Sequence, residues 1–245
     1  ELIEQASQTA AAAFQHTRKE PAHKRAALLE RIANRIEARK DEFTETIVRE
    51  VGKPVTFAEG EVNRAIMTFR TAAMEALAAH GELLPLDALQ PGSQHFGIAR
   101  RFPLGVIAAI TPFNFPLNLV AHKVGPCIAT GNTMVLKPAS KTPLSALLLA
   151  EILLESEMPA GQVNVVTCTN EDAAPLIHDD RVKKISFTGS PAVGWKMKEE
   201  CGRKKITLEL GGNAGVIVHR DADLDRAIPL IATGAFGSAG QSCIS

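Results

Sequence analysis

The sequence has no excess of charge of one sign, because 27 Lys and Arg residues balance 27 Asp and Glu residues. Without a basic surplus it has no electrostatic basis for binding nucleic acid or an acidic membrane surface. It also lacks an apolar run long enough to span a membrane, since its most hydrophobic segment, 144–154, is interrupted by Ser145 and Glu151. No positively charged leader with an apolar core opens the chain. We therefore expect neither a nucleic-acid partner nor a membrane partner.

Cysteine is scarce, and its spacing excludes two kinds of site. The four cysteines are far apart and form no C-x-x-C pair: Cys127, Cys168, Cys201 and Cys243. This spacing argues against a zinc cluster and against a disulfide framework. We expect no metal site. Four unpaired thiols fit a reducing cytoplasm better than secretion.

What is present is an ordinary globular composition. Apolar residues make up 45% and charged residues 22% of the 245 residues, which argues against disorder. This length allows one large domain or two of ordinary size. The chain begins with Glu1 instead of Met and stops two residues after Cys243. We therefore expect it to be part of a longer reading frame at both ends.

Residues 1–80 have a helical pattern. Apolar residues recur at helical spacing between Pro21 and the stop signal Gly52-Lys53-Pro54: Ala26, Leu29, Ile32, Ala33 and Ile36. A second long helix is predicted over 58–79, closed by His80-Gly81. We interpret the many charges on these helices as solvated faces and assign them no chemistry.

Residues 81–103 are turn-rich, with Pro85 and Pro91-Gly92, and predict one or two strands. A ribbon of this kind can pair with another subunit. A plain surface hairpin is equally compatible with the sequence.

From residue 104 onward, short apolar strands alternate with helices. Strands are predicted at Val106–Ile110, Thr133–Leu136, Val163–Val166, Lys184–Phe187, Ile206–Leu210 and Val216–Val218. Helices are predicted at Leu117–Ala129, Pro143–Glu155, Glu171–His178 and Pro191–Glu200. Such alternation indicates a parallel sheet covered by helices on both faces. Ligands of such sheets bind beyond the carboxyl ends of the strands.

Two of the strand ends carry candidate polar groups. Pro112 and Pro116 fix the backbone around Asn114, whose amide is the kind of donor that an oxyanion hole needs; the alternative is a turn asparagine. Lys137 ends the next strand, within reach of a ribose or a phosphate, and is otherwise a surface lysine. Thr142 is predicted as the N-cap of the following helix, with Pro143 at its first position.

Two later strand ends add a phosphate seat and a carboxylate. Ser190 is predicted to cap a helix after Gly189, where free N–H groups and the helix dipole suit a pyrophosphate. The G-x-G-x-x-G fingerprint is absent from the whole chain. Glu209 precedes Gly211-Gly212 and suits a general base if it is partly buried; the alternative is a salt-bridged glutamate.

Small residues lead into the last cysteine, in the order Gly240-Gln241-Ser242-Cys243. A thiol in such a setting can approach a substrate, and its thiolate is the nucleophile. The alternative is a buried structural cysteine.

Taken together, these motifs occur in one order at compatible spacings: Asn114-Phe115-Pro116, Lys137-Pro138, Phe187-Thr188-Gly189-Ser190, Glu209-Leu210-Gly211-Gly212 and Gly240-Gln241-x-Cys243. The chain resembles the aldehyde dehydrogenase superfamily along its whole length. The resemblance implies an α/β fold: a Rossmann-like parallel sheet with helices on both faces, a helical N-terminal segment and a projecting β-ribbon for oligomerisation. It places a cofactor-binding domain at 1–210, the ribbon at about 85–103, and the start of a second α/β catalytic domain at 211–245.

The resemblance also implies roles for single residues. Cys243 would be the nucleophile, Asn114 would hold the oxyanion together with the Cys243 backbone N–H, and Glu209 would activate the hydrolytic water. Lys137 would contact the adenosine ribose, and Gly189 and Ser190 the pyrophosphate. The remaining positions implied near the cofactor are Ser140, Thr111, Pro112, Phe113 and Leu210, of which Phe113 also lies near the substrate.

The implied reaction is oxidation of an aldehyde to a carboxylic acid with NADP or NAD. It passes through a cysteine thiohemiacetal and a thioester, in a homodimer or homotetramer. Ser140, followed by Lys141, stands where NAD-preferring members often have a glutamate, so we expect NADP to be accepted. The loop 167–173 lacks the family's usual glycines. The alternatives are a catalytically incomplete nucleotide-binding fragment and a structural protein that reuses the fold.

Overall fold

The computed structural model describes residues 1–78, 81–88, 90 and 94–243. Its first part is helical, as predicted: α1 (Leu2–Thr17), α2 (Ala22–Ala38), α3 (Lys40–Val51) and α4 (Val55–Ala78). Apolar positions at helical spacing explain this region, because Leu29, Ile32 and Ile36 of α2 are all fully buried. The helix α3 ends at Gly52, which has the left-handed backbone conformation typical of a helix C-terminus. The predicted end of α4 at 79–80 lies outside the described residues.

The centre of the fold is a five-stranded parallel sheet in the order β5-β4-β3-β6-β7. Its strands are β3 (Val106–Ile110), β4 (Thr133–Lys137), β5 (Val163–Val165), β6 (Val182–Thr188) and β7 (Lys205–Glu209). From β3 the chain adds β4 and β5 on one side, and then returns to add β6 and β7 on the other. The last residue of β3, Ile110, pairs with Lys137 on one side and with Phe187 on the other. The strand order therefore reverses at β3, which is where open α/β sheets bind their ligands.

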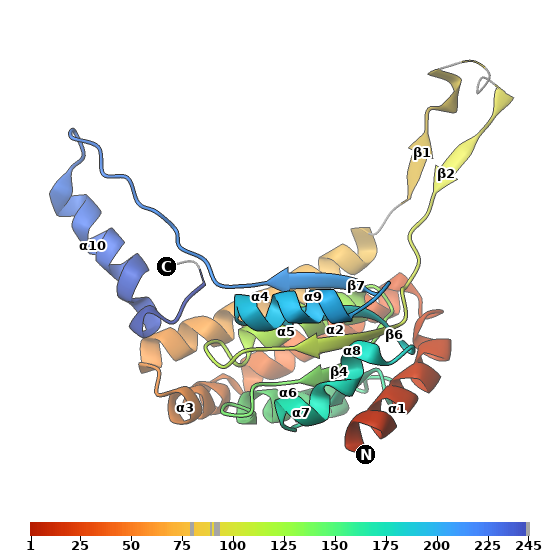
Figure 1. Ribbon diagram of the computed structural model, residues 1–245, viewed down its shortest axis with the longest axis horizontal. Coiled ribbons are helices and arrows are strands. Elements are labelled where there is room, and N and C mark those ends of the chain that lie inside the picture. The colour runs from red at the N-terminus through yellow and green to blue at the C-terminus, as the bar shows by residue number, and fades with distance from the viewer. Residues whose placement is uncertain (79–80, 89, 91–93, 244–245) are drawn as a thin grey trace.

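Helices cover both faces of this sheet (Figure 1). They are α5 (Asn118–Ala129), α6 (Leu144–Glu155), α7 (Asn170–Ala173), α8 (Pro175–His178) and α9 (Pro191–Glu200). Alternate residues of β3 divide between two cores: Ile107 and Ala109 pack with α2 to α6, while Val106 and Ala108 pack with α1, α8 and α9. This period of two explains why every residue of the strand is apolar.

A two-stranded antiparallel ribbon projects from the body (Figure 1). It consists of β1 (Glu82–Leu84) and β2 (Gly97–Ala99), with Leu84 opposite Gly97 and a short 3₁₀ turn, η1 (Leu86–Ala88), between them. Its strands begin three residues before the predicted start at 85. The predicted turn at Pro91-Gly92 lies outside the described residues. Whether the ribbon joins subunits stays a prediction.

After β7 the chain leaves the sheet in an extended segment and turns back through α10 (Leu224–Phe236) and η3 (Gly237–Gly240). The strand predicted at Val216–Val218 is wrong, because these residues pair with no described strand and Ile217 is 94% exposed. Three apolar residues in a row satisfy the strand pattern, but a strand also needs a neighbour to bond with. The division at residue 210 stays a prediction.

Two local predictions also need correction. Helix α6 begins at Leu144 with Pro143 before it, so Thr142 is not the N-cap. The Glu50 carboxylate, from the end of α3, accepts the N–H groups of Leu144 at 2.8 Å and Ser145 at 3.0 Å instead. The predicted helix over 171–178 is interrupted between α7 and α8 at Pro175, because proline lacks the N–H that a continuous helix requires.

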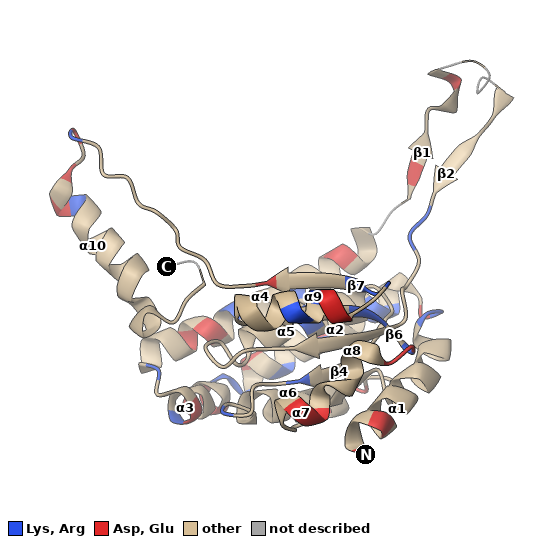
Figure 2. Ribbon diagram, in the orientation of Figure 1, with Lys and Arg blue, Asp and Glu red and all other residues tan. Residues whose placement is uncertain are grey.

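Charged residues of both signs are interspersed over the helices (Figure 2). Within the described ranges, no helix is both long and apolar enough to cross a membrane. The same part of the chain holds no group of three or more His, Cys, Asp or Glu side chains arranged to bind a metal ion.

Candidate active site

The carboxyl ends of β3, β4 and β6 open into a cavity of about 680 Å³ at the point where the strand order reverses. Six of the eight residues predicted to bind the cofactor line it: Thr111, Pro112, Phe113, Lys137, Ser140 and Gly189. Lys141, the cation beside Ser140, lines it as well. Residues from three separate motifs therefore meet in one cavity, as the parallel topology predicts.

Lys137 is buried at the end of β4 and is no surface lysine. Its Nζ donates hydrogen bonds to the Pro138 carbonyl at 3.2 Å and to Ser140 Oγ at 3.3 Å. Burial lowers the pKa of Lys137, and the neighbouring Cys168 opposes this shift. A buried ammonium held by only two weak, neutral acceptors is well placed to bind hydroxyl or phosphate oxygens.

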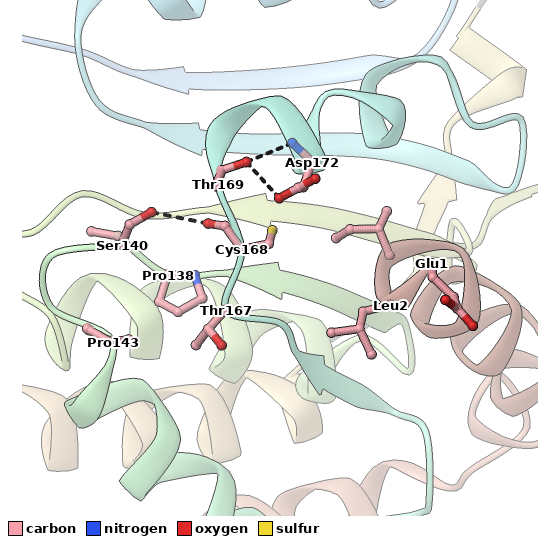
Figure 3. Close-up of a pocket in the computed structure, with 11 residues that line it drawn as sticks. Glu1, Leu2, Pro138, Ser140, Pro143, Thr167, Cys168, Thr169 and Asp172 are labelled. Carbon is pink, nitrogen blue, oxygen red and sulfur yellow. Dashed lines mark hydrogen bonds between the residues drawn. The ribbon is translucent and has the colours of Figure 1, made fainter.

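Ser140 links this cavity to a second one, of about 500 Å³, which shares Ala139 and Ser140 with it (Figure 3). The Ser140 hydroxyl donates to the Cys168 carbonyl at 3.1 Å. The loop that follows β5 is closed by Thr169, whose hydroxyl caps α7 by accepting the Asp172 N–H at 3.1 Å. This loop, which lacks the family's glycines, is thus held by side-chain hydrogen bonds.

Gly189 and Ser190 lie between β6 and α9. A Cβ on Gly189 would come within 2.5 Å of the Phe187 ring, so the turn requires glycine. Its N–H donates to the Glu209 carbonyl at 3.0 Å and is not free for a ligand. Ser190 occupies the N-cap position in an extended conformation, but its side chain makes no capping bond. The donors left for an anion are therefore the first N–H groups of α9 itself, beyond Pro191.

A third cavity, of about 320 Å³, contains all three predicted catalytic residues: Asn114, Glu209 and Cys243. The other two cofactor positions, Ser190 and Leu210, also line it. It shares Pro112, Phe113, Thr188 and Gly189 with the 680 Å³ cavity. A molecule that fills the larger cavity would therefore reach the edge of the space beside Cys243.

Asn114 contacts the loop that carries Cys243. Its Nδ2 donates to the carbonyl oxygen of Gln241 at 2.7 Å, across 127 residues of sequence. The segment after β7 approaches the same loop, since a Cβ on Gly212 would lie 2.6 Å from the Cys243 carbonyl oxygen. Glycine at 212 thus permits a close approach that any side chain would prevent.

Glu209 ends β7, and its side chain is exposed. Glu209 was predicted to suit a general base if it is partly buried. Among the described residues it is exposed, so this condition is not met. Its backbone carbonyl is engaged by Gly189, which fixes where the side chain starts. Glu209 is among the residues that line the cavity with Cys243 and Asn114.

Two charged residues behind Asn114 were not predicted, because all charges of the N-terminal helices were interpreted as solvated faces. Lys53 and Glu61 form an ion pair at 2.6 Å with side chains 1% and 0% exposed. The available signal was position: Lys53 lies within the stop motif Gly52-Lys53-Pro54, between two helices, and is not on a helix face.

A third missed residue is Lys123, on the buried face of α5. Its Nζ donates to Thr188 Oγ1 at 2.9 Å and to Ser186 Oγ at 3.1 Å. Burial lowers its pKa to about 8, and the Glu209 carboxylate opposes the shift. The signal was a lysine among apolar neighbours in a helix predicted to cover the sheet.

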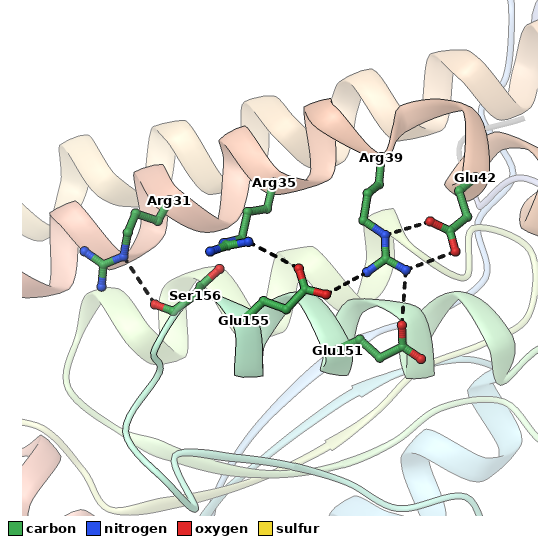
Figure 4. Close-up of polar contacts among 7 residues, drawn as sticks. All are labelled: Arg31, Arg35, Arg39, Glu42, Glu151, Glu155 and Ser156. Atoms are coloured by element: carbon green, nitrogen blue, oxygen red, sulfur yellow. Dashed lines mark hydrogen bonds and ion pairs between the residues drawn. The ribbon is translucent and has the colours of Figure 1, made fainter.

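Other helix charges do match the predicted solvated faces (Figure 4). Arg39, between α2 and α3, contacts Glu42, and also Glu151 and Glu155 of α6, with the three carboxylates 45–61% exposed. Arg35 adds a contact to Glu155 at 3.3 Å. Exposed pairs of this kind contribute little each, about 0–1 kcal/mol.

Comparison with known proteins identifies one family. The family model described as the aldehyde dehydrogenase family matches residues 1–245. Among curated relatives, 3-sulfolactaldehyde dehydrogenase of Priestia aryabhattai is 42% identical over 224 residues, which are 91% of this chain and 47% of that protein. The chain thus spans about half the length of the relatives it matches.

Solved structures agree with the fold. Aldehyde dehydrogenase 21 from Physcomitrella patens, in complex with the reaction product succinate, superposes with a TM-score of 0.94 at 45% identity, over 99% of this chain and 51% of that one. Glyceraldehyde-3-phosphate dehydrogenase from Methanocaldococcus jannaschii, complexed with NADP, gives 0.93 at 39% identity, over 99% and 53%. These matches confirm the predicted parallel sheet flanked by helices.

Proposed function

Because this chain belongs to the aldehyde dehydrogenase family, we propose that the protein oxidises an aldehyde to a carboxylic acid with NADP or NAD. One observation carries the proposal: the Asn114 amide is hydrogen-bonded to the loop of Cys243, with Glu209 lining the same cavity. A nucleophile, an amide donor and a carboxylate in one cavity are the parts that acyl transfer from an aldehyde requires.

The cavity of about 680 Å³ fits a dinucleotide. Lys137 presents a buried ammonium for ribose or phosphate oxygens, and the first N–H groups of α9 are donors for a phosphate. When bound, NADP or NAD supplies the hydride acceptor. Ser140 puts no carboxylate beside the ribose and Lys141 adds a cation, so the site accommodates a 2′-phosphate.

The chain's own residues divide the chemistry into two steps. In the first, the Cys243 thiolate forms a bond to the aldehyde carbon, and the oxyanion is held by Asn114 Nδ2 and the Cys243 N–H. With NADP or NAD held in the larger cavity as the hydride acceptor, this carbon would be left as a thioester on Cys243. In the second, Glu209 takes a proton from water as the water oxygen bonds to the acyl carbon. The C–S bond then breaks, which releases the acid and restores the thiolate.

Glu209 is the residue for the second step alone. Glu209→Gln should therefore stop turnover after one equivalent of reduced nucleotide and leave an acyl adduct on Cys243, detectable by mass spectrometry. Cys243→Ala should abolish oxidation while nucleotide binding is retained. The assay uses the protein expressed from its natural gene. Full turnover by Cys243→Ala would refute the proposal.

We infer an aldehyde that carries an acidic group. The relatives named above act on a sulfolactaldehyde, yield succinate or act on glyceraldehyde 3-phosphate. Here the Arg64 guanidinium lies 5.7 Å from the centre of the ring of Phe115, the residue after Asn114. Arg64→Met should lower kcat/KM for succinate semialdehyde about tenfold or more, and leave that for butanal unchanged.

The assembly and compartment are proposed on separate grounds. The ribbon β1–β2 exposes Leu83, Phe96 and Ile98, at 65–76% each, far from the sheet. A ribbon with apolar side chains pairs readily with a second copy, and we infer a homodimer or homotetramer. All four cysteines are free, which fits the cytoplasm. Native mass spectrometry of Ile98→Asp, expected to shift toward monomer, tests the assembly.

A second candidate applies to the 245 residues on their own: a nucleotide-binding unit without turnover. It is favoured by α10, which has no buried residue, and by the exposure of Glu209. Catalysis needs positioned groups. Binding of NADP without aldehyde oxidation by these 245 residues would support this candidate, and single-turnover oxidation would exclude it.

A further inference from the structure

Lys53 and Glu61 form the one ion pair among the described residues in which both side chains are buried. Lys53 lies between α3 and α4, and Glu61 lies in the second turn of α4. Lys53 Nζ and Glu61 Oε2 are 2.6 Å apart. Replacing such a pair by apolar residues of similar volume is often neutral or stabilising. Stability alone therefore does not explain why this position holds two charges.

The remaining polar contacts of the pair are made with one loop, residues 114–118. Lys53 Nζ donates to the Asn114 carbonyl at 2.8 Å and lies 4.0 Å from the centre of the Phe115 ring. Glu61 Oε1 accepts the N–H groups of Leu117 at 3.0 Å and Asn118 at 3.1 Å. The pair thus holds the loop at its first and last residues.

Glu61 also replaces a capping residue. Helix α5 begins at Asn118, and its own N-cap position, Leu117, has no side chain that can accept a hydrogen bond. The Glu61 carboxylate satisfies the first N–H groups from another helix and faces the positive end of the α5 dipole. The Lys53 ammonium compensates the charge of that carboxylate and also donates a hydrogen bond to the Asn114 carbonyl.

We propose that Lys53 and Glu61 are positioning residues for the oxyanion donor: they fix the Asn114 backbone so that its amide meets the loop of Cys243. Lys53 holds the Asn114 carbonyl while the side chain of the same residue donates to Gln241. The inference rests on the proposed function. Misplacement of a catalytic group by about 1 Å costs about 100-fold in rate, so a loosened loop should slow chemistry without weakening nucleotide binding.

The test measures the first-turnover rate of reduced-nucleotide formation at saturating substrates, in the protein expressed from its natural gene. Lys53→Met and Glu61→Gln should each slow it about 100-fold, with the NADP Kd unchanged within about twofold. Arg70→Met is the matched control, because Arg70 also pairs from α4, with Glu37, but on the surface. This control should keep the wild-type rate.

A double-mutant cycle separates positioning from a structural role. If Lys53 acts through Asn114, the loss caused by Lys53→Met should shrink to about twofold or less in an Asn114→Ala background. Equal losses in both backgrounds would overturn the proposal while leaving the proposed function intact. Failure of the function is visible separately, since Asn114→Ala would then react at the wild-type rate, and this result also refutes the positioning role.

A variant that removes both charges guards against misfolding. Lys53→Met leaves Glu61 buried and unpaired, which can unfold the chain. The double variant Lys53→Met/Glu61→Met leaves no buried charge and keeps the volume. If it folds, by circular dichroism and melting temperature, and still reacts at least about tenfold more slowly, the proposal is supported. A wild-type rate in the folded double variant would overturn it.

Discussion

The Nδ2 atom of Asn114 lies 2.7 Å from the carbonyl oxygen of Gln241, two residues before Cys243. This contact joins the loop after β3 to the loop after η3. The Oδ1 atom of the same amide is buried without a hydrogen-bond partner in the described structure. A buried acceptor left alone is costly, so the amide orientation is set by what Nδ2 can reach. The donor is thereby aimed at the segment that carries Cys243, the proposed nucleophile.

Asn114→Ala should slow formation of reduced nucleotide in the first turnover by about 100- to 1000-fold, because one oxyanion donor is lost. Its NADP Kd should not change. Stopped-flow absorbance checks the rate. Asn34→Ala, an exposed asparagine that accepts a bond from Arg70 on another face, serves as the control. An unchanged rate in Asn114→Ala would remove this residue from the oxyanion site.

Gly212→Ala should reduce turnover while Gly211→Ala leaves it near wild type. A Cβ at 212 would come 2.6 Å from the Cys243 carbonyl oxygen, whereas one at 211 would meet only Pro191 at an ordinary 3.7 Å. Overpacking of this kind typically costs about 1–3 kcal/mol, which here is met by shifting the Cys243 loop. Steady-state kcat, compared with NADP binding, measures the difference. Equal activity of the two variants would contradict the close approach.

Ser140→Glu should shift the preference from NADP toward NAD. Ser140 Oγ lies 3.3 Å from Lys137 Nζ, and a carboxylate at this position would repel a 2′-phosphate and accept the ribose hydroxyls instead. We expect the ratio of kcat/KM for NADP over NAD to fall by about tenfold or more. Ser140→Ala, which removes only the hydroxyl, should change the ratio little. If the wild-type protein strongly prefers NAD, the expectation that Ser140 and Lys141 favour NADP is wrong.

Lys123 should make stability rise at alkaline pH. Its pKa is lowered from 10.5 to about 8 in the folded protein by burial. Between these two values the unfolded chain binds more protons than the folded one, so the free energy of unfolding increases with pH. The cost of burying the charged Lys123 ammonium is present in full below about pH 8. Its removal at higher pH raises the free energy of unfolding by on the order of 3 kcal/mol.

Urea denaturation at about pH 7 and about pH 10 measures this gain. Lys123→Met should abolish the part of the rise that belongs to this residue. Lys24→Met, which removes an exposed lysine, should retain it. If the free energy of unfolding of Lys123→Met rises by the same amount between these pH values, the effect belongs to other groups.

Much of the fold could be predicted because its signals are local. Five of the six predicted strands occur, since buried parallel strands are continuous apolar runs with polar residues at their ends. The sixth, Val216–Val218, has the same composition and fails for lack of a partner. Thr142 failed as a cap because Glu50, 92 residues earlier in the sequence, supplies the acceptor.

The residues of the candidate site could be predicted, but the buried charged residues that hold them in place could not. Asn114, Glu209 and Cys243 were found by motif order, and the structure gathers them in one cavity. Glu61 and Lys123 were missed because a charged residue on a helix is usually solvated, and Lys53, which lies between α3 and α4, was grouped with the charges of those helices.

The sequence by itself determined the order of helices and strands, the edge of the sheet that carries the polar motifs, and the family. These follow from apolar periodicity and from residues next to one another in the chain. Only the tertiary structure decided that Asn114 meets the loop of Cys243 across 127 residues, that Lys53 and Glu61 are buried behind it, and that Glu209 is exposed. Burial and long-range hydrogen bonds depend on which elements pack together, and that is a property of the whole fold.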